Sequence, residues 1–167
     1  DETRFASPQS YTPTHLAEKI LTSRSALEGE RKQVTVLFAD IKGSLELIDS
    51  SDPEFAQALL DPAVNAMMDA VHRYEGTVNK ALGDGIMALF GAPVAHEDHA
   101  VRACYAALAI QDAIRRHGEA VLHSHGVTLQ ARVGLHSGDV VVRSIDNDLS
   151  MDYDAIGATV HLAGRME

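Results

Sequence analysis

The sequence predicts a single α+β domain, and three features carry that prediction. A β-branched apolar run at 34–38 is typical of a buried strand. Two more strand-like segments, 77–82 and 86–90, flank Gly83-Asp84-Gly85, a sequence typical of a tight hairpin. Residues 96–117 place apolar side chains at helical spacing, which predicts a long helix. With 167 residues, 46% of them hydrophobic, the chain has enough apolar material for one packed core.

The composition disfavours several classes of protein. The 24 acidic and 14 basic residues give a formal charge of −10, so broad binding of nucleic acid is not expected. No apolar run approaches the ~20 residues needed to cross a bilayer, and we find no secretory signal. One cysteine, Cys104, permits no internal disulfide. We therefore expect a cytoplasmic protein without a membrane segment.

The first thirty residues are expected to form a linker with one helix, ahead of a domain at 31–167. Thr12 and Pro13 are typical of a helix N-cap and a first helical position, which predicts a helix over about 13–25. This helix is expected to dock on the domain through apolar residues on one side, Leu16, Ile20 and Leu21.

The strand at 33–38 leads into a turn, and two helices are predicted to follow it. Asp52-Pro53 is expected to start a short helix, and Asp61-Pro62 to start another, because an interior proline removes a backbone hydrogen bond. The second helix ends at Glu75-Gly76 and carries apolar residues at helical spacing: Val64, Met67, Met68, Val71 and Tyr74.

The rest of the chain is predicted to form a helix, two strands and a last helix. The long helix at 96–117 is expected to bury Cys104 as a small apolar residue. Strands are predicted at 129–135 and 140–143, on either side of His136-Ser137-Gly138. The last helix is predicted from Ala158 onwards. Two histidine-rich segments are interpreted as structural, the first at a helix start and the second in a loop: His96-Glu97-Asp98-His99 and His123-Ser124-His125.

This order contains the ferredoxin-like βαββαβ unit, with an extra strand and extra helices. A strand joined through helices to a parallel neighbour points the same way as that neighbour, so the end of the first strand and the hairpin tip should share one edge of the sheet. We therefore expect Asp40 and Asp84 to lie near each other. Each aspartate alone also has a plainer interpretation, as a helix cap or as a turn former.

Paired carboxylates at a sheet edge suit hard divalent cations and the phosphates that these ions bridge. The turn after the first strand can add backbone amides at a helix start, which favour a polyphosphate. The residues expected to contact phosphate in this way are Lys42, Gly43, Ser44 and Leu45.

Four motifs occur in order along the chain. They are Phe-Ala-Asp-Ile-Lys-Gly-Ser at 38–44, Lys-Ala-Leu-Gly-Asp-Gly at 80–85, Arg-Val-Gly-Leu-His-Ser-Gly at 132–138, and Gly-Ala-Thr-Val-His-Leu-Ala-Gly-Arg at 157–165. In order and spacing they resemble the class III adenylate/guanylate cyclase catalytic domain, most of all bacterial adenylate-type domains. The resemblance covers about residues 31–167, and the sequence ends before C-terminal strands that the family normally has.

The resemblance implies a two-metal site. Asp40 and Asp84 would bind two Mg²⁺ or Mn²⁺ ions, and a backbone carbonyl near Ile41 would complete the shell of one of them. Lys80 and Asp154 would read the adenine ring from the partner subunit, which favours ATP over GTP. Without the resemblance, Lys80 would be interpreted as a solvated strand residue and Asp154 as a helix-start cap.

The resemblance also assigns residues to the transferred phosphate. Arg165 matches an arginine that stabilises charge on the α-phosphate, a role suited to a permanently ionised guanidinium. His161 lies four residues earlier, where the family more often has asparagine. Asp139 is a second departure, because some relatives place a triphosphate-binding arginine there; whether Arg143 substitutes stays open.

We therefore expect an adenylate cyclase that converts ATP to 3′,5′-cyclic AMP and pyrophosphate in a head-to-tail homodimer with two sites. Further domains are expected in the full-length protein. The alternative is a catalytically weak or inactive cyclase-like module that binds nucleotide or dimerises to regulate an attached domain, which the His161 and Asp139 departures motivate. A diguanylate cyclase has less support, because the hairpin lacks a Gly-Gly-(Asp/Glu)-Glu-Phe sequence.

Overall fold

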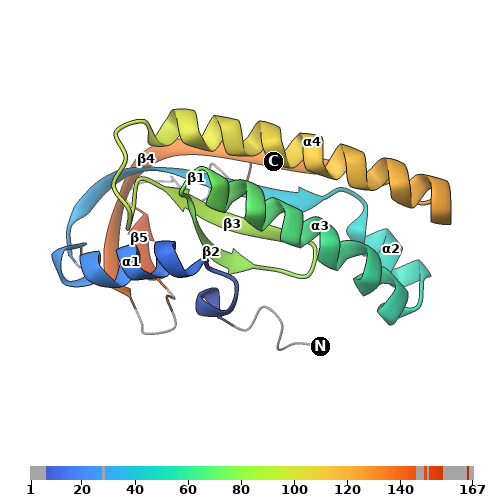
Figure 1. Cartoon of the computed structure of the whole chain (residues 1–167), viewed down its shortest axis with the longest axis horizontal. Helices are drawn as coiled ribbons and strands as arrows, with labels where there is room; N and C mark the ends of the chain where they lie inside the picture. The colour runs from blue at the N-terminus through green and yellow to red at the C-terminus, as the bar shows by residue number, and fades with distance from the viewer. Residues whose placement is uncertain (1–6, 28, 146–148, 150, 156–164, 166–167) are drawn as a thin grey trace.

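The computed structural model describes residues 7–27, 29–145, 149, 151–155 and 165. Its strands form one five-stranded sheet in the order β2-β3-β1-β4-β5, with every pair antiparallel. Figure 1 shows the long helices lying along this sheet. The elements are η1 (Pro8–Ser10), α1 (Thr14–Leu27), β1 (Arg31–Ile41), α2 (Ser44–Ser50), α3 (Pro53–Arg73), β2 (Thr77–Ala81), β3 (Gly85–Phe90), α4 (His99–His125), β4 (Ala131–Ile145) and β5 (Met151–Ala155).

The predicted α+β class and the ferredoxin-like core are confirmed. Strands β4-β1-β3-β2 have the neighbour order of the βαββαβ unit, and β5 adds a fifth strand beside β4. We expected Asp40 and Asp84 to be close because of a strand parallel to β1, and this argument is incomplete. The strands that pair with β1 are β3 and β4, and both are antiparallel to it. In an antiparallel pair, the end of β1 meets the start of β3, and this pairing brings the hairpin tip to Asp40.

Different helices pack on the two faces of the sheet. Leu37, Ala39 and Ile41 point to one face and pack in a core with α3 and α4, whereas Val34 and Val36 point to the other face. On that second face lies α1, whose Leu16 and Ile20 are fully buried, as expected for a helix that docks on the domain. Leu21 of the same helix is exposed.

Charged contacts tie α1 to the turn between α3 and β2. Lys19 Nζ lies 2.6 Å from Glu75 Oε1. This hydrogen bond holds the pKa of the Glu75 carboxyl below its ordinary value, and the nearby His96 and Arg102 act in the same direction. The first segment of the chain is therefore attached to the sheet by both apolar and polar contacts.

The expected restart of the helix at Pro62 is wrong, because α3 runs without a break from Pro53 to Arg73. Pro62 is exposed, while its neighbours Leu59 and Ala63 are buried, so the lost backbone hydrogen bond falls on the solvent side. His117 Nε2 of α4 donates to the carbonyl of Leu59 at 3.1 Å, one turn before the proline. Packing of the buried stripe thus holds the helix together through Pro62.

Two predicted boundaries in the second half are also wrong. The strands expected at 129–135 and 140–143 form one strand, β4, because all eleven residues of β1 pair with it, including opposite His136, Ser137 and Gly138. Helix α4 extends to His125, so the histidines at 123 and 125 lie in its last turn and not in a loop. Gly118 permits the segment before β4 to pack closely on α4, since a Cβ there would lie 2.8 Å from the carbonyl oxygen of Leu129.

The expected burial of Cys104 is wrong as well: the thiol is exposed. The buried stripe of α4 is formed by Ala103, Ala106, Ile110, Ile114, Gly118 and Val121. Because alanines occur on several sides of this helix, apolar spacing alone does not identify the face that packs on the sheet. Among the described helices, none combines the length and apolarity required to cross a membrane.

Candidate active site

The tip of the hairpin between β2 and β3 contacts the end of β1. Asp40 stands directly opposite Gly85, the first residue of β3, and the backbone nitrogen of Ile41 donates to the carbonyl oxygen of Asp84 at 2.9 Å. A Cβ on Gly85 would lie 2.3 Å from the carbonyl oxygen of Ala39, so only glycine fits this approach. The predicted proximity of Asp40 and Asp84 is therefore confirmed at the level of the backbone.

Asp84 is held by the turn that follows β1. Its Oδ2 accepts a 2.6 Å hydrogen bond from the Ser44 hydroxyl, and Ser44 is buried. Gly43 precedes it with a φ of 78°, in the left-handed region that glycine favours, and α2 begins at Ser44. The serine side chain, expected near phosphate, is thus used to orient the aspartate.

Asp40 is held from the other side by a residue that was not predicted for the site. Arg132 lies directly opposite Asp40 on β4, and its guanidinium forms hydrogen bonds with both carboxylate oxygens. The Nε donates to Oδ1 at 2.8 Å, and Nη2 donates to Oδ2. The side chain of Asp40 is 20% exposed and that of Arg132 is 48% exposed, so the pair lies at the surface of the sheet edge. Arg132 begins the third of the four motifs, but the sequence alone does not show which residue of β1 it faces.

The donor set at this edge fits a hard divalent cation. Two carboxylates from neighbouring strand ends, with main-chain carbonyls beside them, supply the oxygen ligands that Mg²⁺ and Mn²⁺ prefer. A carboxylate oxygen has two lone pairs, so the bonds from Ser44 and Arg132 leave acceptor capacity on Asp84 and Asp40. Within the described part of the chain, no cluster of three or more histidine, cysteine or acidic side chains is suited to a metal. A site of two aspartates and a carbonyl is smaller than such a cluster.

The turn predicted to bind phosphate borders a cavity of about 360 Å³. Lys42, Gly43 and Ser44 line it, together with Glu46, Leu47 and Ser50 of α2 and residues 127–130; the aspartates at 40 and 84 do not. The backbone nitrogen of Lys42 donates to the carbonyl oxygen of Gln130 at 2.8 Å, so this amide is already used. Leu45 lies in the first turn of α2. The Lys42 side chain is exposed.

The residues expected to read the base lie on the two edge strands. Lys80 is exposed on β2, opposite Met87 of β3. Asp154 pairs with Val141 within β5, so it is a strand residue and not a helix-start cap. Three strands separate β2 from β5 in the sheet, so strand pairing within one chain does not bring Lys80 and Asp154 together.

The residues expected to act on the transferred phosphate are only partly described. His161 lies outside the described residues, and Arg165 is helical and exposed. Asp139, where some relatives have an arginine, lies opposite Gln33, and its Oδ2 is 3.7 Å from Arg31 Nη1.

The histidine-rich segments have structural contacts, as expected. His99 Nδ1 lies 2.8 Å from the Thr35 hydroxyl, which also contacts Ser137 at 2.7 Å, so this histidine joins α4 to β1 and β4. His96 Nε2 lies 3.1 Å from Glu75 Oε2. His125 packs edge-on against the ring of Phe55, with centroids 5.3 Å apart.

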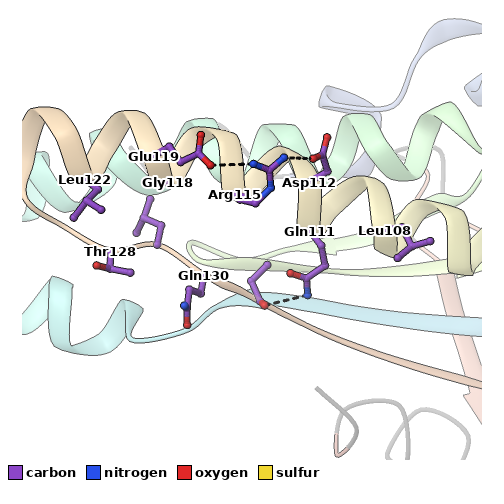
Figure 2. A pocket seen from close by; sticks show the side chains of 11 residues that line it. Leu108, Gln111, Asp112, Arg115, Gly118, Glu119, Leu122, Thr128 and Gln130 are labelled. Carbon is purple, nitrogen blue, oxygen red and sulfur yellow. Dashed lines mark hydrogen bonds and ion pairs between the residues drawn. The ribbon is translucent and has the colours of Figure 1, made fainter.

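A second and larger cavity, of about 620 Å³, lies between α4 and the segment leading into β4. Figure 2 shows Arg115 on its rim, paired with Asp112 and Glu119 of its own helix. Gln111 Nε2 donates to the carbonyl oxygen of Ala131 at 3.1 Å. Neither aspartate of the sheet edge lines this cavity, so it is separate from the candidate site.

Comparison with known proteins identifies the family of the chain. Residues 28–167 match the family described as "Adenylate and Guanylate cyclase catalytic domain". The chain is 31% identical over 159 residues to "Adenylate cyclase 1" of Rhizobium meliloti (strain 1021), covering 94% of this chain and 24% of that protein. This chain therefore spans about a quarter of the length of that curated relative.

Solved structures of both kinds of cyclase resemble this fold. The guanylyl cyclase Cya2 matches with a TM-score of 0.74 and 31% identity, covering 84% of this chain and 71% of that one. The adenylyl cyclase CyaB from P. aeruginosa matches with a TM-score of 0.72 and 33% identity, covering 83% and 72%. These matches leave the choice between ATP and GTP open. The sequence match and the fold together establish that the chain belongs to the adenylate and guanylate cyclase catalytic domain family.

Proposed function

We propose that this chain is an adenylate cyclase catalytic domain that converts ATP to 3′,5′-cyclic AMP and pyrophosphate. The observation that supports it most is the meeting of Asp40 and Asp84 at the ends of two paired strands, where Ser44, in the turn after β1, donates to Asp84. In the reaction, the ribose 3′-oxygen attacks the α-phosphorus, its proton leaves to solvent or to substrate phosphate, and the bond to pyrophosphate breaks.

Asp40, Asp84 and the Ile41 carbonyl are the groups that would hold two Mg²⁺ or Mn²⁺ ions. When bound, such ions supply activation of the attacking oxygen and neutralisation of the leaving pyrophosphate. The turn at Lys42, Gly43, Ser44 and Leu45 would hold the triphosphate next to these carboxylates. Ser44 and Arg132 hold the side chains of Asp84 and Asp40 in place. The two carboxylates would therefore lose little conformational freedom when metal and nucleotide bind.

Lys80 and Asp154 would select adenine. The ammonium group of Lys80 can donate to adenine N1, and the carboxylate of Asp154 can accept from the N6 amine. At the same two places guanine has an N1–H donor and an O6 acceptor, so the pattern is reversed. Arg165 would stabilise the charge that develops on the α-phosphate, and His161 would donate a hydrogen bond where relatives more often use asparagine.

We propose a head-to-tail homodimer, because the resemblance assigns the metal-binding and base-reading residues of one site to different subunits. In this arrangement we place Arg165 on the subunit that supplies the base-reading residues. A mixing experiment tests this arrangement. Asp84→Ala and Arg165→Ala variants are each expected to be inactive, but a 1:1 mixture forms heterodimers with one intact site. Half of the dimers then have one working site of two, so about a quarter of the wild-type activity should return. A mixture as inactive as its components would contradict the shared site.

The activity itself is tested by measuring cyclic AMP and cyclic GMP from Mn²⁺-ATP and Mn²⁺-GTP. We expect cyclic AMP from ATP, loss of that activity in Asp84→Ala, and a lower ATP/GTP ratio in Lys80→Glu. The assay should use a protein extended past Glu167 as well as this chain. Absence of both products from the extended protein would refute the proposed enzyme, and an unchanged ratio would remove base reading from Lys80.

A regulatory module without turnover is the second candidate. It is favoured by Asp139, whose carboxylate faces Arg31 at a place where some relatives have a phosphate-binding arginine. Such a module would bind nucleotide or dimerise without making cyclic AMP. Nucleotide binding measured by calorimetry, together with absent turnover in the extended protein, would identify it.

A further inference from the structure

The ion pair between Arg132 and Asp40 restricts the carboxylate and also brings a permanent positive charge to the candidate metal site. These residues are direct cross-strand partners on β4 and β1, so their side chains leave the sheet on the same face. The guanidinium donates through Nε and Nη2 to the two carboxylate oxygens, with the Nε contact at 2.8 Å. A fork of this kind fixes the plane of the carboxylate as well as its position.

The two aspartates of the site are thus held by different kinds of donor. Asp84 accepts from a neutral hydroxyl, that of Ser44, whereas Asp40 accepts from a permanent positive charge. A divalent cation that binds at Asp40 must share the carboxylate with this charge, which repels it. Added negative charge, such as a nucleotide triphosphate, offsets that repulsion.

We propose that Arg132 is a positioning residue that orients Asp40 and lowers the affinity of the site for divalent cations until a nucleotide is present. This inference rests on the proposed role of Asp40 and Asp84 as metal ligands. It predicts that removing the arginine has two opposite effects: tighter binding of a bare cation and slower turnover of the metal–nucleotide complex. A merely structural role for Arg132 would weaken binding and turnover together.

The test measures Mn²⁺ binding without nucleotide, by electron paramagnetic resonance of the free ion, in the wild type and four variants: Arg132→Met, Arg132→Lys, Arg31→Ala and Asp84→Ala. Arg132→Met removes the charge and keeps an unbranched stem, and Arg132→Lys keeps the charge without the fork. Arg31→Ala is the matched control, since it removes an exposed arginine of β1 that faces a carboxylate outside the metal pair. Thermal unfolding of each variant shows that the fold is intact.

We expect Arg132→Met to bind the site-specific Mn²⁺ about tenfold more tightly than wild type, a modest change because the pair is partly exposed to solvent. Arg132→Lys and Arg31→Ala should stay within about twofold of wild type in Mn²⁺ affinity. In cyclase assays, both Arg132 variants should lose about tenfold or more in kcat, because neither retains the fork. Arg31→Ala should keep its kcat.

The outcomes separate this inference from the proposed function. Equal Mn²⁺ affinity in wild type and Arg132→Met, or tighter binding in Arg132→Lys as well, would overturn the role of the Arg132 charge while leaving the metal site in place. Asp84→Ala identifies the site itself, because it should lose the specific Mn²⁺. If Asp84→Ala binds as much Mn²⁺ as wild type, the proposed metal site fails, and the inference about Arg132 fails with it.

Discussion

Acid should destabilise this fold through one buried histidine, His72, near the end of α3. Its side chain is buried, and its Nε2 has no hydrogen-bond partner among the described residues. Burial lowers the pKa of His72 from 6.5 to about 4; nearby Asp69 opposes this shift, and His15 of α1 adds to it. The ring is therefore neutral in the folded chain at neutral pH, whereas in the unfolded chain it takes up a proton near pH 6.5.

The magnitude follows from the difference between the two pKa values. Because the folded pKa is the lower one, the unfolded chain binds more protons below about pH 6.5, and stability falls as the pH drops toward 4. At about 1.4 kcal/mol for each unit, the full shift corresponds to roughly 3 kcal/mol, of which about 2 kcal/mol is lost by pH 5. Above pH 7 this contribution is constant.

Urea unfolding followed by circular dichroism measures this effect. His72→Gln, which stays neutral, should lose about 2 kcal/mol less than wild type between pH 7.5 and pH 5. His123→Gln is the matched control, because His123 is exposed on α4, and it should keep the wild-type pH dependence. Identical pH dependence in wild type and His72→Gln would refute the assignment of this loss to His72.

Two further substitutions test the packing that positions the site. Gly85→Ala should destabilise the fold by about 1–3 kcal/mol and weaken Mn²⁺ binding, because its Cβ would lie 2.3 Å from the Ala39 carbonyl oxygen. Gly83→Ala, whose Cβ meets nothing within 4 Å, should be close to neutral in urea unfolding, and equal effects of the two would contradict the close approach. Ile20→Ala on α1 should cost about 2–5 kcal/mol because Ile20 is fully buried against the sheet, whereas Leu21→Ala should cost much less. A small effect of Ile20→Ala would show that α1 is not part of the stable unit.

Much of the fold follows from local patterns in the sequence. The β-branched run of β1 and the glycines of the hairpin identify three strands, because strand and turn preferences act over a few residues. The order of elements then predicts the ferredoxin-like core and the proximity of Asp40 and Asp84. Both were confirmed, although the proximity comes from an antiparallel pair and not from a parallel one.

The features that were missed depend on contacts between distant segments. The pair between Asp40 and Arg132 requires the register of β1 on β4, which no local pattern determines. The continuity of α3 through Pro62 depends on packing of the residues on both sides of it. Cys104 was expected to be buried because α4 is rich in alanine on several sides, and only the sheet decides which side is covered.

The most direct test is a crystal structure of the protein with Mn²⁺ and an ATP analogue that cannot cyclise. Anomalous scattering at the manganese edge locates the ions independently of the nucleotide. We expect manganese within bonding distance of the carboxylates of Asp40 and Asp84 of one chain, in contact with the triphosphate. Manganese bound elsewhere, with these two carboxylates still held only by Arg132 and Ser44, would contradict the two-aspartate site.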